Sequence, residues 1–302
     1  MWNKTKKMKK IGFLDYYIDE WHANQYPEML ASSCWKDEFE IAYAWEEIPA
    51  FQVPGATGKQ NLEQWCATRN IRGAGSIEEL ADKSDAIVLL SPGWPEHHER
   101  LSQIILTSGK PVYIDKPMTD SYEAAKRMFA LADAHGTPVM SSSALRFGSH
   151  LQAQLNAFEN NPVNFASSRG SGKIRGFINY GIHQIEMLVM ALGSGASRVM
   201  QMYDADSEID FMLIDYPDGR RGTLNRMPGL GFELIGCCRD NREFRISEFT
   251  DFFPNMIDNM MQFFVSGEPS VPREQTLEAT RIFEAGIKAL SVPGTWVDCP
   301  VD

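Results

Sequence analysis

Short apolar runs alternate with longer amphipathic stretches over the first half of the chain, and this alternation constrains the fold more than any other feature. The runs are Ile11–Leu14, Ile41–Trp45, Ala86–Leu90, Val112–Ile114 and Val139–Met140. Buried strands separated by helical segments are typical of βαβ units around a parallel sheet. We therefore predict a doubly wound α/β domain over residues 1–145.

The pattern changes after residue 146. Helical spacing over 149–159 and over Gly181–Leu192 comes before a series of strands, and two more helices end the chain near Phe252–Val265 and Glu274–Leu290. The strands are expected at Val199–Tyr203, Phe211–Tyr216, Gly222–Asn225, Phe232–Cys238 and Phe244–Ile246. Strands in series with helices at the flanks predict an α+β domain over 146–302, built on a mostly antiparallel sheet.

Composition excludes several classes of function. The formal net charge of −11 opposes a phosphate backbone, so nucleic acid is not an expected partner. No stretch reaches the ~20 apolar residues of a membrane helix, and no signal peptide is evident, so we expect no membrane partner. The five cysteines are scattered without CxxC spacing, which favours a reducing, cytoplasmic setting.

A lysine follows the strand Val112–Ile114, in the segment Asp115-Lys116-Pro117. Ligands of open α/β sheets bind outside the carboxyl ends of the strands, so Lys116 is directed at the expected cleft. Taken alone, a solvated loop lysine would explain the same pattern.

A second polar segment opens the helix over Gly181–Leu192. Asn179 and His183 are four residues apart and can face one cleft together, and a histidine can accept the proton of an alcohol. His183 with Glu186 could instead hold a metal, but the sequence offers no third ligand nearby, so we predict no metal site. An ordinary interior histidine is the simplest alternative.

Together these segments resemble the glucose-fructose oxidoreductase, inositol dehydrogenase and MocA family, called Gfo/Idh/MocA. Asp115-Lys116-Pro117 is similar to its Glu-Lys-Pro motif, and the stretch from Asn179 to Gly193 is similar to its D-x-x-x-H motif and the helix behind it. Ser91-Pro92-Gly93 resembles its Thr-Pro-Asn turn, and Arg146-Phe147 resembles the Arg-Phe that ends its sixth strand.

The resemblance implies a Rossmann-like domain followed by a domain with an open-faced sheet that often forms homo-oligomers. It also implies NAD(P)-dependent oxidation or reduction of small sugars, polyols and related compounds. Lys116 would then bind the substrate hydroxyl and His183 would take its proton. Asn179 stands where the family has an aspartate; an amide can orient the imidazole or the substrate, but it carries no charge to stabilise an imidazolium.

The turn after the first strand departs from the family. Dinucleotide-binding members have GxGxxG there, whereas this chain has only Gly12, within the strand. Asp15 would place a charge beside the phosphates, Tyr17 would obstruct the backbone's approach, and Asp19 with Glu20 would occupy the positive end of the helix, Asp19 as its expected N-cap. We therefore predict that NAD(P) binds weakly, in an altered pose or not at all.

The remaining cofactor-site candidates follow from the resemblance. Glu46 or Glu47 ends the second strand where a ribose-binding acid would stand, which favours NAD over NADP. The same carboxyl edge of the sheet is expected to carry Ser91, Pro92, Lys116 and His97. His97 either lies near the cofactor or the substrate, or it is an exposed residue at the start of its helix. Trp94 either stacks on a sugar or packs over the domain.

The function expected is an oxidoreductase of the Gfo/Idh/MocA type acting on a small carbohydrate-like substrate with a nicotinamide cofactor. Two alternatives stay open: a sugar-binding or regulatory protein that has lost the dinucleotide, and a lyase or hydrolase that recycles a tightly held cofactor. Whether the chain is an enzyme at all is not decided by the sequence.

Overall fold

The computed structural model describes residues 7–53, 56, 58–158, 161–171, 176–202 and 210–301. The expected ends of the helix over 149–159 and of the strand Val199–Tyr203 lie outside the described residues. The chain forms two compact units. The first takes in the chain up to Asp115, Lys126–Ser141 and Met256–Ser270, and the second takes in Lys116–Ala125, Ser142–Asn255 and the chain from Val271. The division at residues 145 and 146 stays a prediction.

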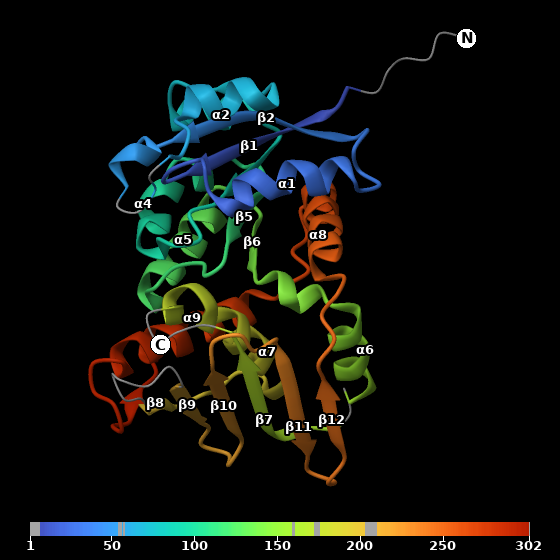
Figure 1. Cartoon of the computed structure of the whole chain (residues 1–302), viewed down its shortest axis with the longest axis vertical. Coiled ribbons are helices and arrows are strands. Elements are labelled where there is room, and N and C mark those ends of the chain that lie inside the picture. Colours follow the sequence, from blue (N-terminus) through green and yellow to red (C-terminus); the bar gives the residue numbers. More distant parts are fainter. Residues whose placement is uncertain are drawn as a thin grey trace. The chain divides into compact units, whose positions relative to one another are not determined.

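The first unit is built on a six-stranded sheet in the order β3-β2-β1-β4-β5-β6 (Figure 1). Its strands are β1 (Lys9–Asp15), β2 (Phe39–Glu46), β3 (Arg72–Gly73), β4 (Ala86–Leu89), β5 (Val112–Asp115) and β6 (Val139–Ser142). The order reverses between β1 and β4, which places a ligand crevice at the carboxyl ends of these two strands. The doubly wound α/β prediction is confirmed.

Helices pack against this sheet, and α1 and α2 lie on the same side of it, because Trp65 and Arg69 of α2 both donate to Asn24 of α1. The helices of the unit are α1 (Trp21–Ala31), α2 (Leu62–Arg69), α3 (Ile77–Lys83), α4 (His98–Ser102), most of α5 (Tyr122–Ala134) and most of α8 (Phe252–Ser266). Met256 of α8 packs on the hydroxyl groups of Tyr26 and Tyr113, with its Sδ 3.9 and 3.7 Å away. α8 therefore completes the core of the first unit although it comes late in the sequence.

The single glycine of β1 serves packing. A Cβ atom on Gly12 would overlap with Oγ of Ser84 and would lie 2.9 Å from Cδ2 of Leu80. Only a residue without a side chain lets α3 and the residue after it approach β1 this closely.

The second unit contains a seven-stranded sheet in the order β12-β11-β7-β10-β9-β8-β13. Its strands are β7 (Val163–Gly170), β8 (Arg198–Met202), β9 (Asp210–Asp215), β10 (Arg221–Arg226), β11 (Glu233–Cys238), β12 (Glu243–Ile246) and β13 (Val297–Asp298). All pairs are antiparallel except β7 with β10. The mostly antiparallel sheet is confirmed, but its central strand β7 was not among the expected strands.

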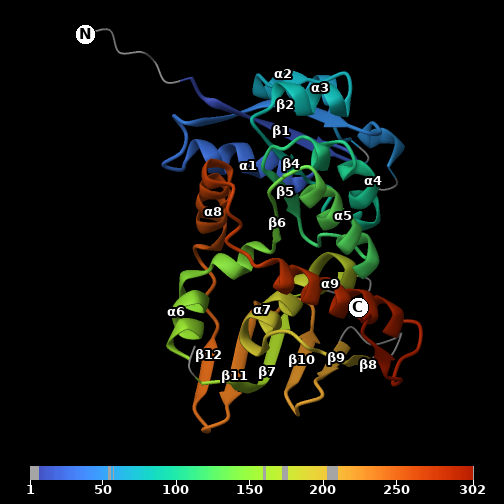
Figure 2. The same ribbon diagram turned by 180° about the vertical axis from the view of Figure 1, so that it is seen from behind.

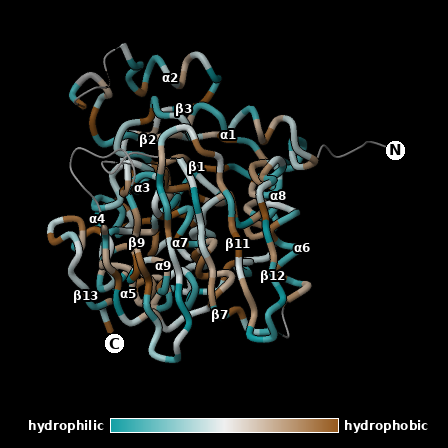
Figure 3. Tube along the Cα trace, turned by 60° about the horizontal axis from the view of Figure 1, so that its bottom comes forward, coloured by the Kyte–Doolittle hydropathy of each residue, from teal (hydrophilic) through white to brown (hydrophobic). Residues whose placement is uncertain are grey.

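One face of this sheet packs against α7 (Ile182–Leu192) and α9 (Arg273–Ala289), with α6 (Ser149–Ala157) at the β12 side (Figure 2). On the other face hydrophilic and hydrophobic residues are mixed along the strands (Figure 3). Phe165 and Ile235 lie on this face and are 38% and 39% exposed. The open-faced sheet is therefore present in the described residues. No helix in the described residues is long and apolar enough to cross a membrane.

Candidate active site

The ring of His183 is held by a serine distant in sequence. His183 lies in the first turn of α7, after a π-helical turn over Phe177–Gly181. Ser143 follows β6, and its Oγ lies 2.6 Å from Nδ1 of His183. The same Oγ accepts the backbone N–H of Leu145 at 3.2 Å, so the hydroxyl is fixed in position. The bond to Nδ1 orients the ring and directs proton exchange with a ligand to Nε2.

A buried ion pair supports Ser143. Its backbone N–H donates to Oε1 of Glu186 at 2.8 Å, and Oε2 of Glu186 lies 3.5 Å from the Arg146 guanidinium. Burial lowers the pKa of Arg146, while the charge of Glu186 opposes that shift. Arg146 also donates to Gln275 of α9. The sequence analysis weighed Glu186 as a metal ligand, whereas the structure engages both of its oxygens in positioning Ser143.

Lys116 belongs to the same compact unit as His183. Its side chain is buried at 6% exposure. Among the described residues, its ammonium group has neither a hydrogen-bond nor an ion-pair partner. A largely buried lysine whose ammonium has no protein partner is typical of a group that meets its partner in a ligand.

Asn179 lies close to His183 in sequence, but another residue bonds to the imidazole. It lies in the π-helical turn and is exposed, and the bond to Nδ1 of His183 comes from Ser143. Two aromatic rings flank the imidazole instead, with centroids 6.3 Å away for Tyr180 and 5.8 Å for Phe232. The sequence analysis missed Ser143 and Phe232, because only the paired strands bring them to His183.

The cofactor candidates of the first unit lie around the turn between β1 and α1. Asp15 is fully buried, and its Oδ1 accepts both the backbone N–H and the Oγ–H of Ser91 at 3.0 Å. Ser91 adopts a φ of +58°, and Pro92 follows it in the turn. Burial, together with the charge of Glu20, raises the pKa of Asp15 well above its usual value. The Oδ2 atom of Asp15 is buried without a partner.

Glu20, not Asp19, caps helix α1, which corrects the sequence expectation. Its carboxylate accepts the backbone N–H groups of His22 and Ala23. Asp19 is turned instead toward the backbone N–H of Gln60 and the side-chain amide of Asn24.

Glu46 ends β2 as expected, and both of its oxygens hold backbone groups. They accept the N–H of Ile18 at 3.0 Å and of Leu62 at 2.7 Å. Burial raises the pKa of Glu46. Glu47 pairs with Arg100. Both acids are therefore engaged within the protein.

Aromatic side chains fill the space beside this turn. Trp94 packs against Tyr16 and Tyr17, with ring centroids 5.7 and 5.3 Å away, and His97 stacks on Tyr16 at 4.3 Å. Burial, with the charges of Glu20, Asp15 and Asp19, raises the pKa of Tyr17 to about 12. Trp94 and His97 are thus packed within the first unit. For Trp94, this is the alternative in which the side chain packs over the domain.

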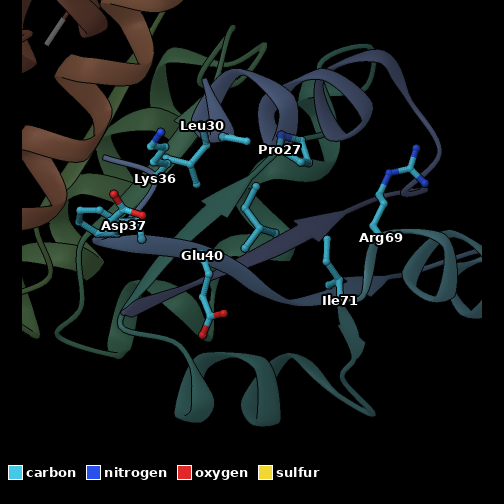
Figure 4. Close-up of a pocket in the computed structure, with 10 residues that line it drawn as sticks. Pro27, Leu30, Lys36, Asp37, Glu40, Arg69 and Ile71 are labelled. Atoms are coloured by element: carbon cyan, nitrogen blue, oxygen red, sulfur yellow. The ribbon is translucent and has the colours of Figure 1, made fainter. Parts of the chain in front are cut away.

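A groove of about 360 Å³ lies elsewhere on the first unit, between α1, β2 and the end of α2 (Figure 4). Lys36, Asp37 and Glu40 line it together with apolar residues. Arg69 at its rim is engaged, because it donates to Asn24 at 2.7 Å and stacks on Trp65. None of the site residues expected from the sequence lines this groove.

Comparison with known proteins adds the family. The model of the Gfo/Idh/MocA family, described as an oxidoreductase family with an NAD-binding Rossmann fold, matches residues 44–143. Over these residues the chain is similar to the Gfo/Idh/MocA family. The predicted resemblance is thereby confirmed. The match begins after the turn between β1 and α1. The curated proteins gave no match.

Solved structures share the fold of this chain. Myo-inositol 2-dehydrogenase from Lactobacillus plantarum is 14% identical, with a TM-score of 0.78 over 97% of this chain and 100% of its own. Scyllo-inositol dehydrogenase from Lactobacillus casei with NAD(H) and scyllo-inositol is 14% identical, with a TM-score of 0.77 over 97% and 99%. The WlbA dehydrogenase from Bordetella pertussis with NADH and UDP-GlcNAcA is 16% identical, with a TM-score of 0.74 over 98% and 100%.

The residues of the β1–α1 turn do not fit a dinucleotide that rests its pyrophosphate on α1. The amide groups of His22 and Ala23 already bind the Glu20 carboxylate, and Asp15 adds a second acid beside it. A phosphate in that position would meet engaged donors and a carboxylate. The family's cofactor therefore enters the proposed function only as a class of hydride acceptor.

Proposed function

We propose that this protein is an oxidoreductase of the Gfo/Idh/MocA type that acts on a hydroxyl group of a small sugar or polyol. The proposal rests chiefly on one observation: the largely buried side chain of Lys116 has no partner for its ammonium in the described residues and lies in the same unit as His183. The inositol dehydrogenases of similar fold support the substrate class.

The two groups divide the work at the substrate hydroxyl. Lys116 donates a hydrogen bond to the hydroxyl oxygen and stabilises the alkoxide that forms there. His183 accepts the hydroxyl proton at Nε2, while its Nδ1–H donates to Oγ of Ser143. A positioned base of this kind contributes about 10²–10⁴ in rate. Asn179, in the exposed turn before α7, is proposed to contact the substrate and not the imidazole.

Oxidation of the carbon also needs a hydride acceptor, and a nicotinamide dinucleotide is the class that the family description supplies. NAD is favoured over NADP, because the Glu46 carboxylate at the end of β2 repels a 2′-phosphate. In the first unit, the residues proposed around it are Asp15, Tyr17, Ser91, Pro92 and His97.

A turnover assay tests this function. The purified protein is incubated with NAD⁺ and with myo-inositol, scyllo-inositol or glucose, and NADH formation is followed by absorbance. We expect turnover with at least one of the three, and a loss of about 100-fold or more in Lys116→Met and in His183→Gln. Lys110→Met is the matched control, because Lys110 donates to the carbonyls of Ala81 and Asp82 and faces no substrate in this scheme.

A second candidate function is a sugar-binding protein that does not use the dinucleotide. The capping of α1 by Glu20 favours it, since the phosphate position is filled. Calorimetric titration with the same three compounds separates the two candidates. Binding that is lost in Lys116→Met, without turnover in the wild type, would replace the oxidoreductase with the binding protein.

We propose a homo-oligomer formed through the open face of the second sheet, in a reducing cytoplasm. Phe165 and Ile235 are exposed there, between ion pairs such as Arg169 with Glu233. Exposed apolar patches of this kind mark interaction sites. All five cysteines are free thiols. Light scattering should give more than one subunit for the wild type and fewer for Ile235→Glu; a monomeric wild type would contradict the proposal.

A further inference from the structure

The backbone amides around the β1–α1 turn are occupied by the protein's own side chains. Tyr16 N–H donates to Oγ of Ser91 at 2.8 Å, and Ile18 N–H donates to Glu46 at 3.0 Å. In α1, the N–H groups of His22 and Ala23 both donate to Glu20. Four donors that could face an anion at this crevice are thus already satisfied.

The Glu20 carboxylate accepts hydrogen bonds from the amides of His22 and Ala23, as a phosphate would. Its Oε2 accepts the backbone N–H of His22 at 2.8 Å, and its Oε1 accepts that of Ala23 at 2.5 Å. Oε2 also lies 3.0 Å from Nδ1 of the His22 ring. The carboxylate, 6% exposed as part of Glu20, is therefore held by three donors and by the positive end of α1.

The rest of the turn lacks the glycines that let a pyrophosphate approach the backbone closely. Residues 13–20 include no glycine, and Tyr16 and Tyr17 pack with Trp94. The unpartnered Oδ2 of Asp15 is buried close enough to Glu20 for their charges to interact. A second anion there would meet two carboxylates in a poorly solvated site.

We propose that Glu20 is a built-in substitute for the cofactor pyrophosphate, so that its carboxylate occupies the anion site of α1 and weakens NAD binding by this chain. The inference rests on the proposed function for the identity of the ligand, a nicotinamide dinucleotide. According to the proposal, the Glu20 carboxylate and the dinucleotide phosphates compete for the backbone amides of His22 and Ala23. Removing the carboxylate while keeping α1 capped opens the site.

Glu20→Ser is the variant that tests this competition. Serine is among the best N-cap residues, so α1 keeps a cap while the charge and the length of the side chain are lost. NADH is titrated into wild type and variant by calorimetry, without substrate. We expect the variant to bind NADH at least about tenfold more tightly than the wild type, which corresponds to about 1.4 kcal/mol. Inorganic pyrophosphate should raise the Tm of the variant and not that of the wild type.

Two further variants make the result unambiguous. Glu20→Gln keeps the size and removes the charge, and should give a smaller tightening in the same direction. Glu63→Gln removes an exposed carboxylate from the first turn of α2 and should leave NADH affinity unchanged. Far-UV circular dichroism confirms that each variant is folded.

Three results would overturn the proposal. The first is a micromolar Kd for NADH in the wild type that Glu20→Ser leaves unchanged or weakens. The second is equal tightening by Glu63→Gln, which would indicate net charge alone. The third is an absence of NADH binding in all four proteins at millimolar concentration. Because these titrations contain no polyol, they are independent of the turnover assay that tests the proposed function.

Discussion

The Oγ atom of Ser143 lies 2.6 Å from Nδ1 of His183, across forty positions of sequence. Ser143 is itself held by the carboxylate of Glu186, one turn further along the helix that carries His183. The imidazole is thus positioned from two elements at once, β6 with the residues after it and α7.

Replacing Ser143 by alanine tests its positioning role. A hydrogen bond of about 0.5–1.5 kcal/mol is lost, so kcat should fall about 2- to 10-fold with KM nearly unchanged. Ser143→Thr keeps the hydroxyl and should restore kcat. The ring-nitrogen resonances of His183, assigned with His183→Gln, should shift in Ser143→Ala and stay in place in Ser143→Thr. Unchanged resonances and kcat in the alanine variant would assign Ser143 no role beyond its backbone bond.

Lys116→Met should stabilise the protein while it abolishes turnover. A lysine that is only 6% exposed and has no described partner for its charge costs free energy, and methionine fills a similar volume without charge. The midpoint of thermal unfolding should rise for Lys116→Met and fall for Lys110→Met, which loses two hydrogen bonds to carbonyls. A lower midpoint for Lys116→Met would mean that Lys116 is a structural residue.

Asp15 should make the free energy of unfolding fall as pH rises, whereas most carboxylates make it rise. Burial raises the pKa of the folded state above that of the unfolded chain, so its stabilising contribution is fully present below the unfolded pKa and is lost as pH rises through the folded pKa. Urea midpoints measured from about pH 4 to 8 should therefore fall more steeply for wild type than for Asp15→Asn. Parallel curves would contradict the prediction.

Gly12→Ala should destabilise the first unit by about 1–3 kcal/mol, because the added methyl group meets Ser84 and Leu80. Gly231→Ala is the matched control, since a Cβ there meets nothing within 4 Å. Denaturant unfolding measures both. Adding Ser84→Ala to Gly12→Ala should recover part of the loss, and failure to recover any would place the strain elsewhere.

Local patterns in the sequence were sufficient for β1, β2, β4, β5 and β6 of the first sheet, because each apolar run must be buried on its own. They missed the edge strand β3, whose two residues Arg72 and Gly73 are exposed. They were not sufficient for β7, whose residues Ser167, Ser168 and Arg169 are polar. Its place between β10 and β11 comes from pairing on both edges, with Thr223 and Asn225 of β10 bonded to the Ser167 hydroxyl. Pairing of this kind is a property of neighbours far along the chain.

The same distinction between local pattern and distant contacts applies to the candidate site. The sequence by itself determined that Lys116 follows a strand, that His183 opens a helix and that no phosphate-binding glycines follow β1. Only the tertiary structure decided that Ser143 orients His183 and that Glu20, not its neighbour Asp19, caps α1. The physical reason is that periodicity and end signals depend on adjacent residues. A hydrogen-bond partner depends instead on which side chains and backbone groups the sheets and helices bring within about 3 Å of each other.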